Sequence, residues 1–427
     1  MDVDGATRPL SRRESLATHA RGPVVVAAGA AVLGVFSYVY LTIAARRLDP
    51  ASFGELSALW AAIFGFVAGL WYPFEQELTR LVASTSETVS VAAEDLRRVA
   101  GVQAVTLVVA EVVALAVMVA THGALFGGSV TIVVALLLSL LSLSAVGYQR
   151  GRLVGARRFG WAAVQQGTDG TVRAVGAIAC AATGASVGAY ALVLALAPLA
   201  GVIAALPGTP PSSSELAPTR SWTLVIQDLL ALLAGSYGAI VLLNIGPLVV
   251  RVGAGAEQTG RFMAVFIVAR LPLFFASPVV AGLLPSFVDA YGADSGRSFT
   301  RFVRNVTGVV AAVVVPGCLL LGLLGPWLAR VFFGSAYTAE LSVSVLLAMS
   351  SALFVLGLLM QGALVASDRQ RAVAWSWLAA AIAFAATLTL PLELTVRVSL
   401  GYVLSGVVVV IVMGIRLSRV QRPLDAA

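Results

Sequence analysis

Lysine is missing from this chain, in which all 28 basic residues are arginine. A Walker A loop needs a lysine on the nucleotide phosphates, and a Schiff-base enzyme needs an amine nucleophile. The absence of lysine therefore excludes P-loop ATPases and pyridoxal-type enzymes. We expect no cofactor and no enzymatic activity.

Cysteine and histidine are nearly as scarce, with two residues of each kind: Cys180, Cys318, His19 and His122. Their positions match no metal-ligand spacing, so no metal site is predicted. Both cysteines fall in apolar segments, where a free cysteine behaves as a small hydrophobic residue. We expect them to pack in the core without forming a disulfide.

Charge is also sparse, because only 11% of the residues are charged while 59% are hydrophobic. The mean hydropathy is +0.94, far above that of a soluble domain. These values predict a polytopic membrane protein. The net charge of +7 is the excess expected of loops that obey the positive-inside rule, so no nucleic-acid partner is predicted.

The chain is rich in long apolar runs. A helix needs about 20 apolar residues to cross the hydrocarbon core, and the sequence offers twelve such runs. The predicted fold class is therefore an all-α polytopic membrane protein with about twelve transmembrane helices. The runs lie near residues 23–44, 56–74, 99–121, 129–149, 161–182, 186–206, 222–248, 262–287, 303–324, 341–366, 371–391 and 398–417.

A segment rich in proline and serine, LPGTPPSSSELAPTRS at 206–221, separates the sixth run from the seventh. Its composition argues against a helix and against a packed core, so it is predicted to be a linker. The chain then divides into a cytoplasmic tail (1–22), an N-lobe of six spans (23–206), a cytoplasmic linker (207–221), a C-lobe of six spans (222–417) and a second cytoplasmic tail (418–427).

The arginines predict the orientation of the spans. With the N-terminus inside and the loops alternating, 20 arginines fall in inside segments and 6 in outside loops, while Arg173 and Arg270 lie within spans. Positive charge accumulates on the cytoplasmic side of membrane proteins. We expect a multi-pass protein with both termini cytoplasmic. The abundance of Ala, Gly, Val and Arg points to a coding sequence rich in G and C and so to a bacterium, and the expected location is the bacterial cell (inner) membrane.

An internal repeat relates the two predicted lobes. The stretch 47–59 follows the first span, and a similar stretch from Arg251 to 265 follows the seventh with two extra residues. Six spans per copy give both copies the same orientation, so an axis along the membrane normal should relate them. Asp49 is expected to cap the next helix, Pro50 to occupy its first position and Gly54 to permit a close helix contact.

Ionisable residues inside spans are the candidate functional residues, because each costs roughly 2.5–3.5 kcal/mol to insert. Arg173 and Arg270, with Gln165 and Gln166, are predicted to bind an anionic substrate in a cavity. Candidates for ion coupling are Glu111, Asp169 and Asp228. For Asp169 and Arg173 the alternative is a purely structural pair, since their spacing of four residues places them on one helix face.

Charged residues at the span ends form a second candidate group. Arg46 and Arg47 lie on the outside against the positive-inside trend, so they either form a rim that attracts anions or extend to the membrane interface. Glu77 and Arg80 follow Pro73 at the end of the second span. They are candidates for a gate or an ion site, with an ordinary cytoplasmic boundary as the alternative.

Three stretches carry a resemblance to a known family. ARRLDPASFGELSAL (45–59) resembles the ARxLGPxxFGxY pattern of bacterial polysaccharide and O-antigen flippases of the multidrug/oligosaccharidyl-lipid/polysaccharide superfamily. GPWLARVFFGSAYTAELSVSVLLAM (325–349) and GALVASDRQRAV (362–373) are similar to that family's loop before span ten and the turn after it. Asp49 replaces the usual glycine, and Glu55-Leu56 stands where a tyrosine is frequent.

The resemblance implies a MATE-like fold with two six-helix lobes around a central cavity. It further implies alternating access that moves a polyprenyl-diphosphate-linked oligosaccharide from the cytoplasmic to the outer leaflet for cell-surface polysaccharide biosynthesis. Arg173 and Arg270 would bind the diphosphate. Membrane lipids and a glycan polymerase or glycosyltransferases would be the partners.

Other functions share parts of this pattern. An ion-coupled exporter of small molecules or drugs has the same spans and linker, and so does a major-facilitator transporter, whose typical loop after the second span is absent here. A membrane glycosyltransferase or polymerase should carry a large outer loop, which the predicted spans do not leave room for. A scaffold without transport activity would use the span arginines structurally.

Overall fold

The computed structural model describes residues 12–83, 93–121, 124–210, 221–293, 296–338 and 340–419. These residues form helices joined by short turns, and no strand occurs among them. The helices are α1 (Arg12–Arg47), α2 (Pro50–Ala62), the π-helical turn η1 (Ile63–Val67), α3 (Ala68–Ala83), α4 (Ala93–Ala120), η2 (Ala124–Phe126), α5 (Val130–Gly155), α6 (Phe159–Thr183), α7 (Val187–Ala204), η3 (Leu206–Gly208), α8 (Trp222–Asn244), α9 (Gly246–Gly282), α10 (Leu284–Ala293), α11 (Gly296–Phe333), α12 (Leu341–Ala366), α13 (Gln370–Thr387) and α14 (Leu394–Ser418).

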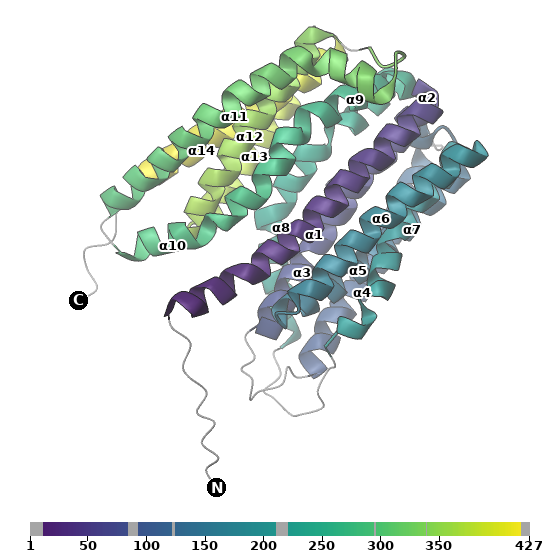
Figure 1. The fold of residues 1–427 in the computed structure, drawn as a ribbon. Helices are drawn as coiled ribbons and strands as arrows, with labels where there is room; N and C mark the ends of the chain where they lie inside the picture. The colour runs from purple at the N-terminus through teal and green to yellow at the C-terminus, as the bar shows by residue number, and fades with distance from the viewer. Residues whose placement is uncertain are drawn as a thin grey trace.

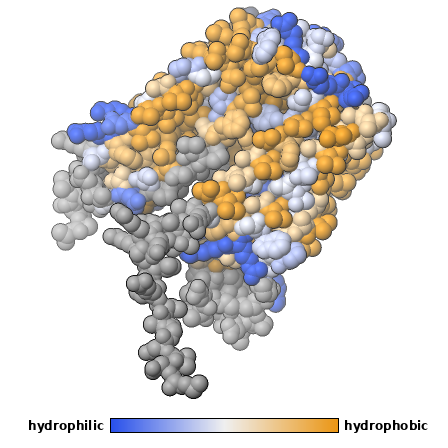
Figure 2. Space-filling model, in the orientation of Figure 1, coloured by the Kyte–Doolittle hydropathy of each residue, from blue (hydrophilic) through white to orange (hydrophobic). Residues whose placement is uncertain are grey.

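The predicted all-α membrane fold is confirmed. Nine helical stretches among the described residues are long and apolar enough to cross a membrane. Helix α6, which carries the most polar of the predicted spans, is not one of the nine, so the predicted count of twelve is approximate. Apolar side chains cover the body of the molecule in Figure 2, and hydrophilic ones gather toward its ends.

The helices group largely by sequence half (Figure 1). In the first half α1 lies along α6, while α7 packs between α5 and α6, and α3 packs on α5. In the second half α12 lies between α11 and α14 and also contacts α9, and α13 packs on α14. Two contacts join the halves extensively: α2 against α9, and α8 against α3.

The turn between α1 and α2 has the helix cap and the proline position that its sequence predicts. The carboxylate of Asp49 accepts hydrogen bonds from the backbone N–H groups of Ala51 (2.9 Å) and Ser52 (3.1 Å), and Pro50 is the first helical residue. Both predicted roles are confirmed. A further hydrogen bond from the Ser52 hydroxyl, at 2.7 Å, lowers the pKa of Asp49.

Gly54 and Gly260 lie where the backbones of α2 and α9 approach each other closely. A Cβ on Gly54 would lie 1.8 Å from the carbonyl oxygen of Ala256, and one on Gly260 would lie 2.2 Å from that of Pro50. Gly54 thus faces the residue four positions before Gly260, and Gly260 faces the residue four positions before Gly54. Ala256 follows Gly255, whose φ of 84° and ψ of −180° are not helical and break α9 at this point. Asp49, in an extended conformation, separates α1 from α2 in the same way. The contact is reciprocal, as the predicted repeat with its two-residue insertion requires.

Two arginines make similar contacts between the halves, although the repeat aligns Arg251 with Arg47 and not with Arg46. Arg46, at the end of α1, donates to the carbonyl oxygen of Phe332 at 2.7 Å, at the end of α11. Arg251 donates to the carbonyl oxygen of Leu125 at 2.9 Å, in the corresponding connection of the first half. The Tyr337 hydroxyl donates to a backbone carbonyl near the end of α1, at 2.9 Å. We call the contacts of Gly54, Gly260, Arg46, Arg251 and Tyr337 the latch, which holds the two halves together at one end.

The predicted linker differs from expectation at its start. Residues Leu206–Gly208 form η3, and Gly208 is buried against Trp161. Arg158 donates to the Gly208 carbonyl at 2.9 Å, and Gln149 donates to the Thr209 hydroxyl at 2.9 Å. The expectation of an unpacked, helix-free linker is wrong for 206–210, because Leu206–Gly208 are helical and the side chains of Arg158 and Gln149 bind this segment. Residues 211–220 lie outside the described part of the chain.

Candidate functional site

A cavity of about 400 Å³ lies between the two sequence halves. Helices α1 and α2 with η1 form one wall, and α8 and α9 form the other. The π-helical turn η1 adds one residue to a helical turn and brings Phe64 into the lining, and such turns are frequent at functional sites. The lining is mostly apolar and aromatic, and it includes four polar or charged side chains: Ser37, Tyr38, Asn244 and Arg270.

Arg270 is the charged residue of this lining. Its guanidinium lies over three aromatic rings, with centroid distances of 4.8 Å to Phe266, 5.1 Å to Phe354 and 4.7 Å to Tyr402. The side chain is 8% exposed, and its Nη2 donates to the carbonyl oxygen of Leu243 at 3.2 Å. Its Nη1 has no hydrogen-bond partner among the described residues.

A backbone hydrogen bond positions one of the rings around Arg270. The Tyr402 hydroxyl accepts a hydrogen bond from the backbone N–H of Gly246 at 2.7 Å, which fixes its ring beneath the guanidinium. Arginine stays charged in proteins, and a desolvated cation–π contact contributes about 2 kcal/mol. The rings hold the cation in place but leave N–H donors unused. This arrangement can bind an anion through charge-assisted hydrogen bonds.

Arg173 is paired inside the first half. Its Nε and Nη2 donate to the two carboxylate oxygens of Asp169 at 2.7 and 3.0 Å, and both side chains are buried. Its Nη1 donates to the Ser37 hydroxyl at 3.4 Å, and its guanidinium lies 5.5 Å from the Phe64 ring centroid. Because Ser37 and Phe64 line the cavity, Arg173 lies just behind the cavity wall. Of the two alternatives for Asp169 and Arg173, the structure contains the ion pair.

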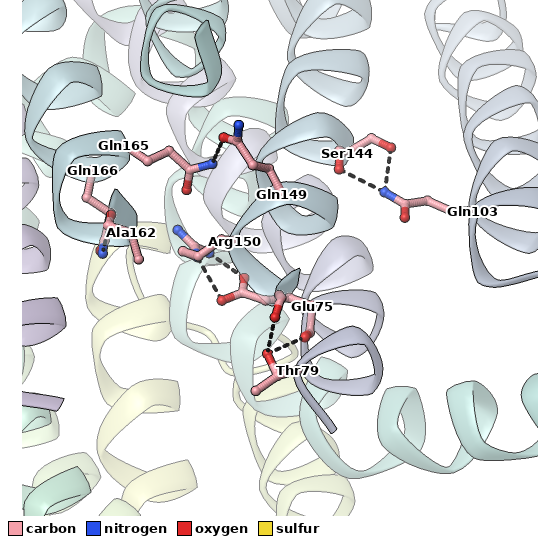
Figure 3. A network of polar contacts seen from close by, with 10 residues as sticks. Glu75, Thr79, Gln103, Ser144, Gln149, Arg150, Ala162, Gln165 and Gln166 are labelled. Carbon is pink, nitrogen blue, oxygen red and sulfur yellow. Dashed lines mark hydrogen bonds and ion pairs between the residues drawn. The ribbon is translucent and has the colours of Figure 1, made fainter. Parts of the chain in front are cut away.

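Gln165 and Gln166 also lie within the first half (Figure 3). Gln165 donates to the side-chain oxygen of Gln149 at 2.6 Å, and Gln166 donates to the backbone carbonyl of Ala162 at 3.2 Å. Neither glutamine is part of the cavity lining. They contribute to the packing of α6 on α5 and within α6.

Glu111 lies on α4, apart from both the cavity and the other charged candidates. Its neighbours Val108, Val112 and Leu115 are all more than half exposed. We therefore expect this surface to face the hydrocarbon of the membrane, and no ion pair of Glu111 occurs among the described residues.

Asp228 joins the predicted gate residues at the other end of the interface between the halves. Arg80 on α3 pairs with Asp228 on α8 at 2.9 Å and with Glu77 at 2.8 Å. Glu77 is fully buried. The three side chains lie beside a hollow of about 700 Å³. The structure thus unites residues that the sequence had assigned to two different roles.

Arg150 belongs to the same region, although the sequence indicated only a loop arginine. It forms a two-point ion pair with Glu75, with Nε at 2.7 Å from the carboxylate (Figure 3). The separation of 75 positions between the partners hides this pair from sequence reasoning. Tyr402, which supports Arg270, was missed for the same reason. Among the described residues, no group of three or more His, Cys, Asp or Glu side chains could hold a metal ion.

Comparisons with known sequences give distant relatives only. No protein-family model matches the chain. It is 25% identical over 367 residues to the uncharacterized protein Rv3630 of Mycobacterium tuberculosis, covering 83% of this chain and 82% of that protein. It is 27% identical over 380 residues to the uncharacterized protein Rv1510 of the same species, covering 84% and 83%.

Comparisons with solved structures identify the fold. The outward-facing conformation of a multidrug resistance MATE family transporter of the MOP superfamily superposes with a TM-score of 0.60 at 13% identity, covering 93% of this chain and 95% of that one. The inward-facing conformation of such a transporter gives 0.58 at 11%, covering 90% and 94%. A MOP superfamily transporter from Pyrococcus furiosus, described as having a binding pocket of reverse polarity, gives 0.55 at 13%, covering 93% and 95%. The chain therefore has the MATE transporter fold, which confirms the predicted MATE-like architecture.

Proposed function

We propose that this protein is a membrane transporter that moves a polyprenyl-diphosphate-linked oligosaccharide between leaflets by alternating access. The observation that carries the proposal is Arg270, a buried cation with an unused N–H donor on a cavity between two similar halves. A fixed cation suits a diphosphate, whose oxygens accept bidentate hydrogen bonds from guanidinium.

The charge of the cavity distinguishes an anionic substrate from a cationic drug. Among the described residues no acidic side chain lines the cavity, and Asp169 behind its wall is already neutralised by Arg173. An organic cation entering this space would meet the charge of Arg270 without a compensating carboxylate. An anion would gain a charged partner in a desolvated site, where electrostatic interactions are strong.

The shape and lining of the cavity suit the rest of such a substrate. Its volume of about 400 Å³ falls within the range of ligand pockets, about 300–1,000 Å³, which accommodates a headgroup and not a long lipid chain. Trp60, Phe64 and Phe274 supply aromatic faces for apolar and sugar surfaces. The motifs at 45–59 and 325–349 that resemble polysaccharide flippases support the same substrate class.

The position of the latch indicates a direction of transport. If the arginine-rich segments are cytoplasmic, the latch lies at the outer face of an inner membrane and closes the halves there. Substrate would then enter from the cytoplasmic side, and opening of the latch would release it outside. The ion pairs of Arg80 with Asp228 and Glu77 lie at the opposite end, where they would serve as the inner gate.

The test is translocation of a fluorescent undecaprenyl-diphosphate oligosaccharide in proteoliposomes. Loss of one charged hydrogen-bonding contact costs about 1.5–3 kcal/mol, so Arg270→Ala should bind the substrate roughly 10- to 150-fold more weakly. Arg270→Lys should retain part of the binding, because the charge remains but the two-point geometry does not. The control is Arg330→Gln, an exposed arginine at the end of α11.

Efflux of an amphipathic organic cation is measured in the same vesicles. Export of the cation without translocation of the lipid-linked oligosaccharide would replace the proposal with the drug-exporter alternative. Equal lipid translocation by wild type and a correctly folded Arg270→Ala would show that Arg270 does not bind the substrate.

A further inference from the structure

Among the described residues, a turn with a left-handed residue other than glycine occurs once in each half. It joins α5 to α6 and again α12 to α13. Arg157 and Asp368 adopt left-handed conformations, with φ of 56° and 57°. The next residues, Arg158 and Arg369, donate their backbone N–H to the carbonyl five positions earlier, at 2.8 and 2.9 Å. The two turns are therefore structural copies.

The arginine after each turn donates hydrogen bonds to backbone carbonyls near the end of another helix. Arg158 donates from Nη1 to the carbonyl of Gly208, just beyond the end of α7, at 2.9 Å. Arg369 donates to the carbonyls of Arg416 and Arg419 at the end of α14, at 3.5 and 3.3 Å. Each guanidinium thus binds the carboxyl end of the last helix in its half, where unpaired carbonyls favour a cation.

A basic pocket lies beside each turn. The first, of about 410 Å³, contains Arg157 and Arg158, and its described lining includes no acidic residue. The second, of about 610 Å³, contains Arg369, Arg371 and Arg416, together with the carboxylate of Asp368. Both pockets also receive the amino end of a helix, α6 or α13, whose first turn has no side-chain cap. Backbone N–H groups at such an end add to the attraction for an anion.

Both pockets adjoin surfaces that face lipid. Trp161 lines the first pocket, and the exposed side chains of Val164, Val175 and Ile178 continue from it along one face of α6. In the second pocket Trp375 continues into exposed Leu378 and Ile382 on α13. Tryptophan is enriched where hydrocarbon meets headgroups. We therefore infer that the arginines lie at headgroup depth, next to the surface that contacts acyl chains.

We propose that each of these two pockets binds the phosphate of an anionic phospholipid, so that one chain holds two such lipids at equivalent positions. Arginines and helix N–H groups bind the phosphate, and the tryptophan and the apolar stripe contact the glycerol and acyl chains. Basic pockets between helix ends are known to hold anionic headgroups. The two sites are separate from the Arg270 cavity and do not depend on its substrate.

Native mass spectrometry of the full-length protein in detergent tests this directly. Phosphatidylglycerol is titrated against phosphatidylcholine, and inorganic phosphate is added in a separate arm. Wild type should bind two phosphatidylglycerol molecules in preference to phosphatidylcholine. Arg157→Gln should weaken one site, and Arg371→Gln with Arg416→Gln should weaken the other. Each lost arginine should reduce affinity roughly fivefold.

Matched variants separate binding from folding. Arg330→Gln removes an exposed arginine outside both pockets and should keep both lipids. Arg371→Lys retains the charge and should restore most of the binding. Equal adducts in wild type and the glutamine variants, or equal binding of phosphatidylcholine, would overturn the proposal. Displacement of the lipid by millimolar inorganic phosphate would show that the pockets recognise free phosphate and would overturn the lipid assignment.

Discussion

The reciprocal glycine contact of the latch yields a quantitative prediction. In Gly54→Ala the new Cβ would lie 1.8 Å from the carbonyl oxygen of Ala256, whereas ordinary contacts begin at 3.4 Å. Backbone oxygens cannot rotate away as a flexible side chain can, so α2 and α9 must separate by about 1.6 Å. Such overpacking typically costs about 1–3 kcal/mol.

That cost applies only while the latch is closed. A state in which the halves part at this end has room for the methyl group, so the substitution should shift the population toward it. A difference of about 1–3 kcal/mol corresponds to a change of roughly 5- to 150-fold in the ratio of the two states. Gly54→Ala should therefore open the latch without removing any charge or hydrogen bond.

Distances between spin labels report the opening. Val130 and Leu341 are exposed and begin α5 and α12, one on each half near the latch. They can be labelled as cysteines after Cys180 and Cys318, which are buried and free, are changed to alanine. In lipid nanodiscs Gly54→Ala should add a longer distance to the distribution seen with wild type.

Gly308→Ala is the matched control, because a Cβ at Gly308 has no atom within 4 Å. It should leave the distances unchanged. An unaltered distribution in a stable Gly54→Ala protein would refute the reasoning that this crossing holds the halves closed.

Three further predictions concern single interactions. Asp169→Asn leaves the buried charge of Arg173 without its carboxylate and should lower the free energy of unfolding by about 3–5 kcal/mol, seen as a large drop in melting temperature in detergent; a drop no larger than that of an exposed substitution would contradict this. Tyr337→Phe removes the hydroxyl that donates a hydrogen bond to the end of α1. It should lower the free energy of unfolding by about 0.5–1.5 kcal/mol in the same assay, and an unchanged melting temperature would contradict this. Asp49→Ala should cost about 1 kcal/mol at neutral pH through loss of the helix cap. Because hydrogen bonds lower the pKa of Asp49, this difference from wild type should persist above the unfolded pKa of about 3.9 and vanish as pH falls through the lower folded pKa; a difference independent of pH would contradict the cause given.

Sequence reasoning succeeded where the determinants are local. Apolar runs place the helices, and Asp49 and Pro50 specify the start of α2 because a cap and a fixed φ act within one turn. The repeat also predicted the equivalence of Gly54 and Gly260. It could not show that these glycines touch each other, because that contact joins residues about 200 positions apart along the chain.

Charged residues were harder to place because their partners are distant in sequence. Asp169 and Arg173 share a helix face, so their pairing was visible as an alternative. Asp228 and Arg80 lie on different halves, and nothing near either residue signals the pair. Glu111 was difficult to place for another reason. Its position in the middle of a span does not show whether its side of the helix faces the cavity or the outer surface of the bundle.

Helix α9 connects the cavity to the latch, because it carries both Arg270 and Gly260. A cation held among Phe266, Phe354 and Tyr402 keeps only part of the stabilisation it would have in water, because aromatic faces and one carbonyl replace few of its hydrogen bonds. An anionic headgroup would supply the missing bonds, so binding releases free energy at the wall formed by α9. Helix α9 also carries Gly260 at the latch. A substrate that shifts α9 toward itself would therefore change the contact between Gly260 and Pro50, and the closed end could open in response to occupancy of the cavity.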